Sequence, residues 1–405
     1  MKVMRLLSSL YHDEDERGIF SLNRLLIKKG HQSVIVASTP KSNELALRLK
    51  RDGGVYVPLS MEKHTWSSLW SVIPLVRLIN HHRPDIIHVH SRTPAWVLKW
   101  ALQLVPIAYR PITIATIYGY YSTTAYNKAI FEADHLISVS NSVTEYIKAH
   151  HDEYDDTTIT RIYRGVDIRK FIYRHHPSVY WLRQIFAEYP NLEHKKWVIF
   201  PNTLDYGKGQ QWLFDIVGNL KESIPNIHVI IMDDDGRENL YVEQFLQRSR
   251  ALNLDNYFTF VGKRFNDSRE WLSAANVVVG LANQPESIGI NVLKAIHLGT
   301  PVVAWNLGIY SELLSELFPQ GLVKDITAKS LCKVVKTQLK NVSRPQMSNE
   351  FTQQQTVEQT IDLYEELLKI THPEKVAKPT KPKPKNSEIS ERKLCRNESQ
   401  TLPKQ

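Results

Sequence analysis

The sequence predicts an α/β protein of two domains, each built around a parallel β-sheet. Short apolar runs rich in β-branched residues alternate with helical patterns along the chain, which is typical of parallel sheets covered by helices on both faces. The length of 405 residues and the 42% share of hydrophobic residues suffice for two separate cores. The stretch 276–304 shows the pattern most completely, since it reads as strand, polar loop, helix and strand.

The first half of the chain supplies the strands of the first predicted sheet. A helical pattern separates each apolar run from the next. The first helix carries cations and a glycine at its end, Lys28-Lys29-Gly30, and residues 13–16 have the spacing of a capping box at its start. The expected strands are 2–7, 33–37, 55–57, 86–90, 113–116, 136–139 and 159–162.

The second half repeats this alternation. Strands are expected at 197–200, 229–232, 258–262, 277–280 and 302–304, and helices over 238–252 and 353–370. The last helix is amphipathic, because its apolar residues Val357, Ile361, Tyr364 and Leu368 fall on one face.

The net charge of +9 is concentrated at the C-terminus. From residue 373 onward there are nine lysines and arginines and four glutamates, a net charge of +5, in a Lys-Pro segment with few apolar residues. Such a segment cannot form a core, so residues 373–405 are expected to be a disordered tail. The rest of the chain is only mildly basic and has no nucleic-acid-binding motif, so a nucleic-acid partner is not expected.

Cysteine content and hydropathy indicate the compartment. Cys332 and Cys395 are far apart and lack metal-ligand spacing, which favours a reducing compartment, hence a cytoplasmic protein. The N-terminal apolar run is short and soon followed by acidic residues, so no signal peptide is expected. No run of 18 apolar residues is present, so no membrane span is expected.

The loop after the strand 277–280 is the first candidate binding site. Loops at the carboxyl ends of parallel strands are where open α/β sheets bind ligands. Gly289, just before the next helical pattern, permits close approach of a ligand to the backbone, and the helix N–H groups there suit an anion such as a diphosphate. Glu286 is an acceptor suited to sugar hydroxyls. An ordinary βαβ unit with a solvated glutamate fits the same residues.

Two further segments of the second half carry charges at strand ends. Lys208-Gly209, just before a helical pattern, places a cation where it can meet a diphosphate, although a solvated turn looks the same. Asp233 and Asp235 have the Asp-x-Asp spacing of a metal-dependent sugar-nucleotide site, but a strand-ending turn is the preferred interpretation. Lys263 and Arg264, in the loop after the strand 258–262, are candidate contacts for a nucleotide.

Polar residues also end two strands of the first half. His90 and Arg92 follow the strand 86–90 and are expected to face a cleft between the domains, although a polar strand end without a ligand fits equally. The His88-x-His90 pair lacks an evident third ligand, so no metal site is expected. Tyr118-Gly119 ends the next strand.

These motifs together resemble family 4 of the retaining glycosyltransferases, which have the GT-B fold. The stretch 285–304 is similar to the family's pattern P-E-x-F-G, then E-A, then G-x-P-V-V-A. Residues 134–140 and 164–171 resemble its A-D-x-I-x-x-S and G-V-D-x-x-x-F segments, and 84–96 resembles bacterial members that build lipopolysaccharide and other surface glycans.

Three positions depart from the family pattern. Lys294 stands where the family usually has a second glutamate that binds the nucleotide ribose. Thr203 replaces the arginine of G-R-L, and Tyr118 replaces the histidine of His-Gly near the reacting sugar. With an ordinary pKa near 10, a tyrosine cannot take the place of histidine as a proton carrier at neutral pH. Lys294 lies two helical turns beyond Glu286 and is expected to replace the missing arginine as a phosphate partner.

The resemblance implies a GT-B fold with two Rossmann-like domains facing across a cleft. The implied divisions are an acceptor-side domain at 1–170, a linker at 171–195, a donor-binding domain at 196–345 and a helix at 346–372 that crosses back to the first domain. Lys208 and Glu286 are the implied catalytic residues. The implied donor-binding residues are Thr203, Gly209, Lys263, Ile288, Gly289, Ile290, Asn291 and Lys294, and the implied acceptor-side residues are His90, Arg92, Tyr118 and Gly119.

The implied function is metal-independent, retaining transfer of a sugar to a glycan or lipid-linked acceptor, with a nucleoside-diphosphate sugar as co-substrate and no cofactor. The three departures leave a second hypothesis, a glycosyltransferase-like binding or scaffold protein without turnover.

The stretch 96–104 is aromatic-rich and amphipathic. A core-facing helix is the preferred interpretation of this stretch, and contact with the cytoplasmic face of a membrane is the alternative.

Overall fold

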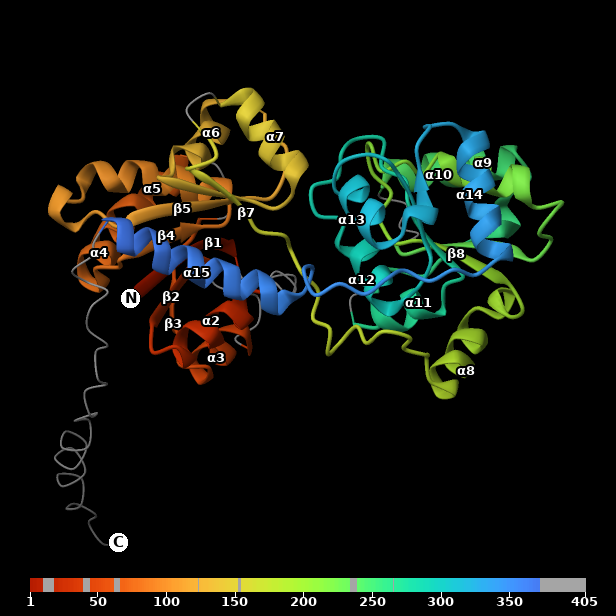
Figure 1. Cartoon of the computed structure of the whole chain (residues 1–405), viewed down its shortest axis with the longest axis horizontal. Helices are drawn as coiled ribbons and strands as arrows, with labels where there is room; N and C mark the ends of the chain where they lie inside the picture. The colour runs from red at the N-terminus through yellow and green to blue at the C-terminus, as the bar shows by residue number, and fades with distance from the viewer. Residues whose placement is uncertain are drawn as a thin grey trace, which may run out of the picture.

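The computed structural model describes residues 1–9, 18–38, 44–61, 66–122, 124–151, 154–233, 239–264 and 266–371. The acidic stretch 13–16, Asp235 and the tail 373–405 lie outside these residues, so the predictions made for them stay predictions. Two α/β domains lie side by side, and the last helix extends from the second domain across the first (Figure 1).

The first domain contains a seven-stranded, all-parallel sheet in the order β3-β2-β1-β4-β5-β6-β7. Its strands are β1 (Lys2–Ser9), β2 (Gln32–Ser38), β3 (Val55–Pro58), β4 (Ile86–Val89), β5 (Ile112–Ile117), β6 (His135–Ser138) and β7 (Ile159–Arg161). Its helices are α2 (Ile19–Lys28), α3 (Glu44–Arg51), α4 (Val72–His82), α5 (Arg92–Leu104), α6 (Ala125–Lys128) and α7 (Asn141–His150), with short 3-10 turns η1 (Trp66–Ser71), η2 (Ile107–Tyr109) and η3 (Ala129–Glu132).

The second domain contains a six-stranded, all-parallel sheet in the order β10-β9-β8-β11-β12-β13. Its strands are β8 (Lys196–Phe200), β9 (Ile227–Ile231), β10 (Phe258–Phe260), β11 (Val277–Gly280), β12 (Val302–Trp305) and β13 (Leu322–Val323). Its helices are α9 (Trp212–Leu220), α10 (Leu240–Ala251), α11 (Ser268–Ala274), α12 (Ile290–Leu298), α13 (Ile309–Leu317) and α14 (Ala328–Lys340). Helix α8 (Val179–Glu188) lies within the segment expected to be a linker.

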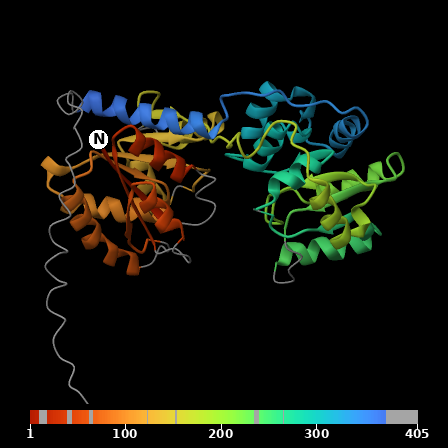
Figure 2. The same cartoon turned by 90° about the horizontal axis from the view of Figure 1, so that it is seen from below.

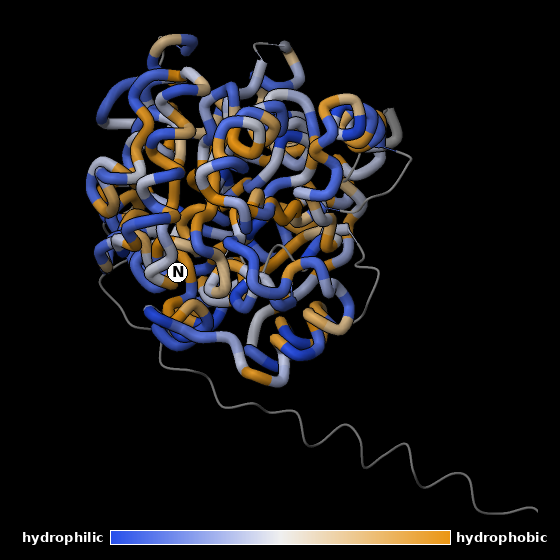
Figure 3. The backbone as a smooth tube through the Cα atoms, turned by 90° about the vertical axis from the view of Figure 1, so that its right-hand side faces the viewer, coloured by the Kyte–Doolittle hydropathy of each residue, from blue (hydrophilic) through white to orange (hydrophobic). Residues whose placement is uncertain are grey.

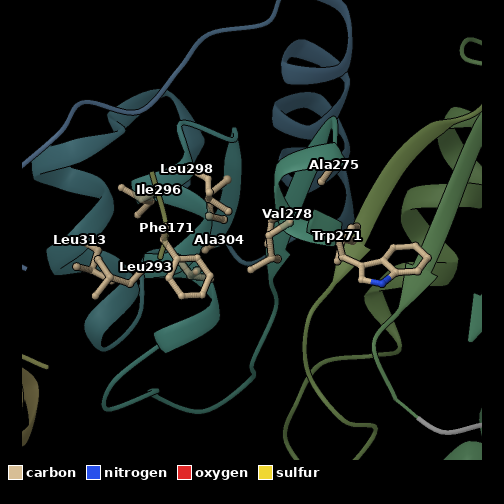
Figure 4. Close-up of a cluster of buried hydrophobic side chains, with 14 of the residues drawn as sticks. Phe171, Trp271, Ala275, Val278, Leu293, Ile296, Leu298, Ala304 and Leu313 are labelled. Atoms are coloured by element: carbon tan, nitrogen blue, oxygen red, sulfur yellow. The ribbon is translucent and has the colours of Figure 1, made fainter. Parts of the chain in front are cut away.

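Apolar strands explain why each sheet is buried on both faces. In the second domain, alternate residues of β8 enter two different hydrophobic clusters, Ile199 on one face and Val198 with Phe200 on the other. Figure 3 shows hydrophobic stretches running through the interior and mostly hydrophilic segments at the periphery. Phe171 lies in the segment that follows β7, the first domain's last strand. Its side chain packs beside Leu293 and Ala304 in the second domain's core (Figure 4).

Helix α15 (Gln353–Thr371) confirms that the C-terminal helix crosses back to the first domain. Its apolar face, predicted from the spacing of Val357, Ile361, Tyr364 and Leu368, is buried in one cluster with residues of β1 and α2. Figure 2 shows the helix lying along the first domain. The predicted architecture of two α/β domains with a C-terminal helix that crosses back to the first domain is therefore confirmed.

Strand order brings particular loops together in each sheet. In the second sheet β8 lies between β9 and β11, so the direction in which strands are added reverses between β8 and β11. In open α/β sheets the crevice outside the strand carboxyl ends at such a reversal is the usual ligand site. The loops that leave β8 and β11 carry Lys208 and Glu286.

Candidate active site

A cavity of about 410 Å³ opens at the carboxyl ends of the second sheet's strands. Its lining includes both residues predicted to be catalytic, Lys208 and Glu286. It also includes all but one of the residues predicted to bind the donor: Thr203, Lys263, Ile288, Gly289, Ile290, Asn291 and Lys294. Gly209 is outside the lining. Arg164 reaches the cavity from the end of the first domain, so the site lies where the two domains meet.

Lys208 and Glu286 form an ion pair within this cavity. The Lys208 Nζ lies 2.7 Å from the Glu286 Oε1, and their side chains are 33% and 23% exposed. The turn that carries Lys208 requires Gly209, which has φ +79° and whose hypothetical Cβ would lie 1.7 Å from the Leu281 carbonyl oxygen. Gly209 thus allows the backbone turn that positions Lys208, although Gly209 itself does not line the cavity.

The N-terminus of α12 forms one wall of the cavity. Gly289 is its N-cap residue in the left-handed region, with φ 58° and ψ 37°, and no side chain caps the helix. The first N–H groups of a helix have no acceptor within the helix, and they carry the positive end of its dipole. The Asn291 Nδ2 donates to the Pro201 carbonyl 2.6 Å away, which ties the helix start to the loop after β8. This arrangement can bind an anion.

Helix α13 supports the same loop from behind. The Ile309 N–H donates to the Glu286 carbonyl at 2.9 Å, and a Cβ on Gly308 would lie 2.5 Å from that oxygen. Tyr310 is buried beneath Gly289, where a Cβ would come within 2.7 Å of its ring. Burial raises the pKa of the Tyr310 hydroxyl, so it stays neutral.

The positions that depart from the family pattern are also in place. Lys294 lines the cavity although it is only 5% exposed, and its Nζ lies 5.4 Å from the centre of the Phe171 ring. Thr203 lines the cavity where the family has arginine. Asp233 is buried, and its Oδ2 accepts the Leu204 N–H at 2.8 Å, so it organises the turn after β8.

The four acceptor-side residues lie on the first domain, outside the lining of the 410 Å³ cavity. His90 Nδ1 and the Tyr118 hydroxyl are 2.9 Å apart, and both residues line a smaller cavity of about 30 Å³ beside Arg164. The Ser287 Oγ donates to the Tyr118 carbonyl at 2.6 Å, which places Tyr118 and Gly119 against the Glu286 loop. Arg92 starts α5 and donates to Asn127 at 3.0 Å.

His88 has a structural environment. It is buried between the Tyr364 hydroxyl of α15, 2.5 Å away, and the Thr116 hydroxyl, 2.7 Å away. Burial, with the nearby Arg5 and Arg164 guanidinium groups, lowers the pKa of His88 to about 3. Within the ranges that the structure describes, no three His, Cys, Asp or Glu side chains are grouped to hold a metal ion.

Arg164 and Tyr310 are site residues that the sequence did not single out. Arg164 precedes the Gly165-Val166-Asp167 segment, which resembles a structural motif, yet its side chain lines the cavity. For Arg164 the available signal was a cation just after a strand; the sequence carried no such signal for Tyr310. Arg264, which was predicted together with Lys263, also lines the cavity.

Two family models match successive parts of the chain. The model described as Glycosyltransferase Family 4 matches residues 16–170, and the model described as Glycosyl transferases group 1 matches residues 183–355. The chain is 24% identical over 244 residues to a D-inositol 3-phosphate glycosyltransferase of Corynebacterium diphtheriae, a match covering 56% of each chain. The chain thus matches only about half the length of this relative.

Solved structures show the same fold over most of the chain. A glycosyltransferase from Rickettsia africae superposes with a TM-score of 0.75 at 17% identity, covering 91% of this chain and 98% of the other. Anabaena HepE in complex with UDP and glucose gives 0.71 at 18% identity, covering 90% and 99%. The lipopolysaccharide outer core galactosyltransferase WaaB gives 0.64 at 12% identity, covering 91% and 100%.

The two family models lie on the two halves of the chain, and the structural similarity covers both domains. The chain therefore belongs to the family 4 type of glycosyltransferases, with the GT-B fold.

Proposed function

We propose that this chain transfers a sugar from a nucleoside-diphosphate sugar to a glycan or lipid-linked acceptor, with retention of anomeric configuration. One observation carries this proposal: Lys208, Glu286 and the N-terminus of α12 converge on one cavity at the reversal point of the second sheet. Uridine nucleotides are the first donors to test, because HepE was solved with UDP and with UDP-glucose.

In the proposed reaction the leaving diphosphate gathers negative charge as the glycosidic bond breaks. The α12 N–H groups and the Lys208 ammonium stabilise that charge, and fixed donors of this kind lower such a barrier. Glu286 orients the sugar hydroxyls. These groups belong to the protein, so the proposed transfer needs no metal ion and no cofactor. The cavity lies between two domains, so closure around the donor excludes water and suppresses hydrolysis.

The Lys208–Glu286 ion pair sets the order of events in the donor site. The Lys208 ammonium donates one of its three N–H groups to Glu286 at 2.7 Å. In the proposed sequence, donor binding exchanges this pair for two new contacts, Lys208 with phosphate and Glu286 with sugar. Lys294 lines the same cavity and is the proposed second cation for the diphosphate, in place of the arginine that is Thr203 here.

A role in lipopolysaccharide or cell-surface glycan synthesis is the proposed context. The fold is shared with WaaB and with WaaG, a glycosyltransferase of lipopolysaccharide biosynthesis with a TM-score of 0.61. The acceptor is then a glycan or lipid-linked glycan at the cytoplasmic face of a membrane, approached from the side of His90, Arg92, Tyr118 and Gly119. No helix in the described part of the chain is long and apolar enough to cross a membrane.

The second candidate function is a binding or scaffold protein that holds a nucleotide without turnover. The observation that favours it is the pairing of Lys208 with Glu286, which neutralises both groups, together with Thr203 and Lys294 in the same cavity.

A panel of nucleoside-diphosphate sugars, followed by thermal shift and by release of nucleoside diphosphate, separates the two functions. The transferase predicts stabilisation by at least one donor, by RT ln(1 + [L]/Kd), and release of its diphosphate on addition of acceptor glycans. The binding protein predicts stabilisation without release. The absence of any stabilisation would rule out both.

A further inference from the structure

The carboxylate of Glu312 joins the two domains. Glu312 belongs to α13 of the second domain, yet its Oε2 accepts the Asn141 N–H at 2.9 Å and its Oε1 accepts the Ser142 N–H at 3.0 Å. Both N–H groups are the first of α7 in the first domain. Figure 1 shows α7 and α13 facing each other where the domains meet.

Helix α7 is capped from two sources. Among the first backbone N–H groups of the helix, its own Ser140 Oγ accepts that of Val143, at 3.3 Å. The two preceding N–H groups are satisfied by Glu312, a negative charge at the positive end of the helix dipole. Charge-assisted bonds of a carboxylate to helix N–H groups are stronger than neutral ones. A capping position within the first domain is thus completed by the second domain.

Tyr163 adds a third donor to the same carboxylate. Its hydroxyl donates to the Glu312 Oε2 at 2.8 Å and receives a bond from the Arg161 guanidinium at 2.6 Å. Burial and the Glu312 carboxylate raise the pKa of Tyr163, which keeps the hydroxyl a donor. Three donors from two separate segments of the first domain therefore fix one side chain of the second.

The same helix that carries Glu312 also holds the donor loop. One turn before Glu312, the Ile309 N–H bonds the Glu286 carbonyl at 2.9 Å. On the other side of that loop, the Ser287 Oγ bonds the Tyr118 carbonyl of the first domain at 2.6 Å. The Glu286 loop therefore contacts the first domain directly through Ser287, and Glu312, on the helix that supports the loop, makes a second interdomain contact of three hydrogen bonds.

We propose that Glu312 is a positioning residue that locks the first domain against the donor loop and so sets the distance between acceptor side and donor. The expected fall in kcat rests on the proposed transferase function, whereas the expected separation of the domains does not. Removal of the carboxylate frees the two helix N–H groups and lets the domains separate, while the donor contacts of the second domain stay in place.

The test compares Glu312→Ala with the parent full-length chain by small-angle scattering, UDP titration and transfer kinetics. Loss of the contact is expected to increase the radius of gyration with UDP bound, to leave the UDP Kd within about twofold, and to lower kcat about ten- to hundredfold through misplacement of the reacting groups. Glu316→Gln, an exposed glutamate one turn further along α13, is the matched control and is expected to change none of the three.

A second set of variants tests the contact from the other side. Asn141→Pro removes one N–H that Glu312 accepts, at the first helical position where proline is well tolerated. Asn141→Ala keeps that N–H and loses only the side chain, whose Nδ2 donates to the Tyr163 hydroxyl at 3.2 Å. Because Asn141→Pro loses the same side-chain bond, Asn141→Ala is the control that isolates the effect of the N–H. Asn141→Pro is expected to open the domains as Glu312→Ala does, and the double variant is expected to be no more open than Glu312→Ala alone.

Three results would overturn the proposal. These are unchanged scattering in both Glu312→Ala and Asn141→Pro, a loss of UDP affinity as large as the loss of kcat, or the same effects from Glu316→Gln. If the parent chain shows no transfer with any donor, the proposed function fails, while the scattering of the variants still decides the role of Glu312.

Discussion

At the residue scale, the paired Lys208 and Glu286 decide how the donor site responds to an anion. A partly exposed ion pair of this kind contributes roughly 0–1 kcal/mol, whereas bonds from an ammonium to phosphate oxygens are charge-assisted and stronger. We therefore expect a diphosphate to compete successfully for Lys208. In the proposed reaction, release of Glu286 from the pair then makes its carboxylate available to the donor sugar.

Lys208→Ala is expected to weaken UDP binding by about 1.5–3 kcal/mol, roughly ten- to hundredfold, because a charged hydrogen bond to the diphosphate is lost. The thermal midpoint without ligand should stay close to that of the parent, since the side chain is partly exposed. Isothermal titration with UDP measures the effect, and Lys221→Ala in the same domain is the control. Unchanged UDP affinity in Lys208→Ala would show that the cation has been wrongly assigned.

Glu286→Gln is expected to act in the opposite direction on nucleotide binding. Removal of its negative charge leaves Lys208 without its ion-pair partner, so UDP should bind as tightly as to the parent or more tightly. Transfer should fall, because the carboxylate that orients the sugar is gone. Titration and single-turnover transfer measured on the same preparation check this, and weaker UDP binding together with normal transfer would contradict both assigned roles.

Sequence reasoning reached these residues one at a time but not their contacts. Lys208 and Glu286 follow apolar strands, and loops after parallel strands meet at one edge, so their proximity was predictable in outline. Their ion pair was not, because it depends on side-chain geometry between loops 78 positions apart. Arg164 was missed because its neighbours Gly165 and Asp167 suggested a structural turn, and only the placement of the first domain brings it to the cavity.

At the element scale, the N-terminus of α12 depends on a backbone conformation that side chains rarely adopt. Gly289 has φ +58°, and the ring of Tyr310 leaves no room for a Cβ. The orientation of the first N–H groups follows from that conformation. We therefore expect the start of this helix to bind an anion only while residue 289 is glycine.

Gly289→Ala is expected to destabilise the fold by about 1–3 kcal/mol through backbone strain and to reduce UDP binding at the same time. Gly218→Ala is the matched control, because nothing lies within 4 Å of its Cβ position in the interior of α9; it should be neutral or stabilising by up to about 1 kcal/mol. Urea unfolding and UDP titration check both variants. A Gly289→Ala protein with parental stability and affinity would contradict the described geometry.

The contact between β4 and α15 should make stability depend on pH. Since the pKa of His88 is about 3 in the folded chain and near 6.5 when unfolded, unfolding takes up a proton between these values. Stability from this residue is therefore present above pH 6.5 and lost as pH falls toward 3. His88→Gln should reduce the slope of unfolding free energy between pH 4 and 6 by up to about 1.4 kcal/mol per pH unit, measured by urea unfolding; equal slopes would contradict it.

The sequence predicted individual helices and strands better than it predicted which elements pack against one another. The docking face of α15 followed from its apolar spacing, and the strands followed from their short apolar runs. The strand β13, of two residues, is too short to give a pattern. Helix α8 lies within the segment expected to be a linker. Its apolar residues Ile185 and Phe186 pack against the second domain's core, and local sequence does not specify such a long-range contact.

At the scale of the whole molecule, the first domain exposes an apolar surface on α4, α5 and the short turns beside them. Trp70 is 84% exposed and Ile107 is 82% exposed, while Ile73, Trp100 and Leu104 are also exposed. Helix α5 faces the core, as the preferred interpretation of the stretch 96–104 expects, since Val97, Leu98 and Ala101 are buried. Its other face is open to solvent, and we propose that these exposed apolar side chains form an interaction surface.

The charge around this surface fits an anionic membrane. Between residues 66 and 110 there are five lysines and arginines and one acidic residue, Asp85, which accepts the Lys2 N–H at 2.8 Å. One of these cations, Lys99, is paired with Glu132 at 2.6 Å. Arg83 stacks over the Tyr109 ring, 4.2 Å from its centre. Exposed aromatic residues flanked by cations suit the interface of anionic lipids. We therefore propose that the first domain contacts the membrane that presents a lipid-linked acceptor.

The full-length chain is expected to sediment with vesicles that contain anionic lipid and less with neutral vesicles. A Trp70→Ser, Ile107→Ser double variant should lose most of this binding, whereas Ile326→Ser, an exposed apolar residue of the second domain, should not. Circular dichroism confirms that each variant is folded. Equal sedimentation of the double variant and the parent would place the membrane contact elsewhere, and no sedimentation of the parent would exclude it.

A crystal structure of the chain soaked with UDP tests the central claim most directly. The account predicts the diphosphate at the N-terminus of α12, within hydrogen-bond distance of the N–H groups at Gly289 and Ile290, with the Lys208 Nζ turned from Glu286 onto a phosphate oxygen. A diphosphate bound outside this cavity, or one inside it with the Lys208–Glu286 pair still formed, would contradict the account.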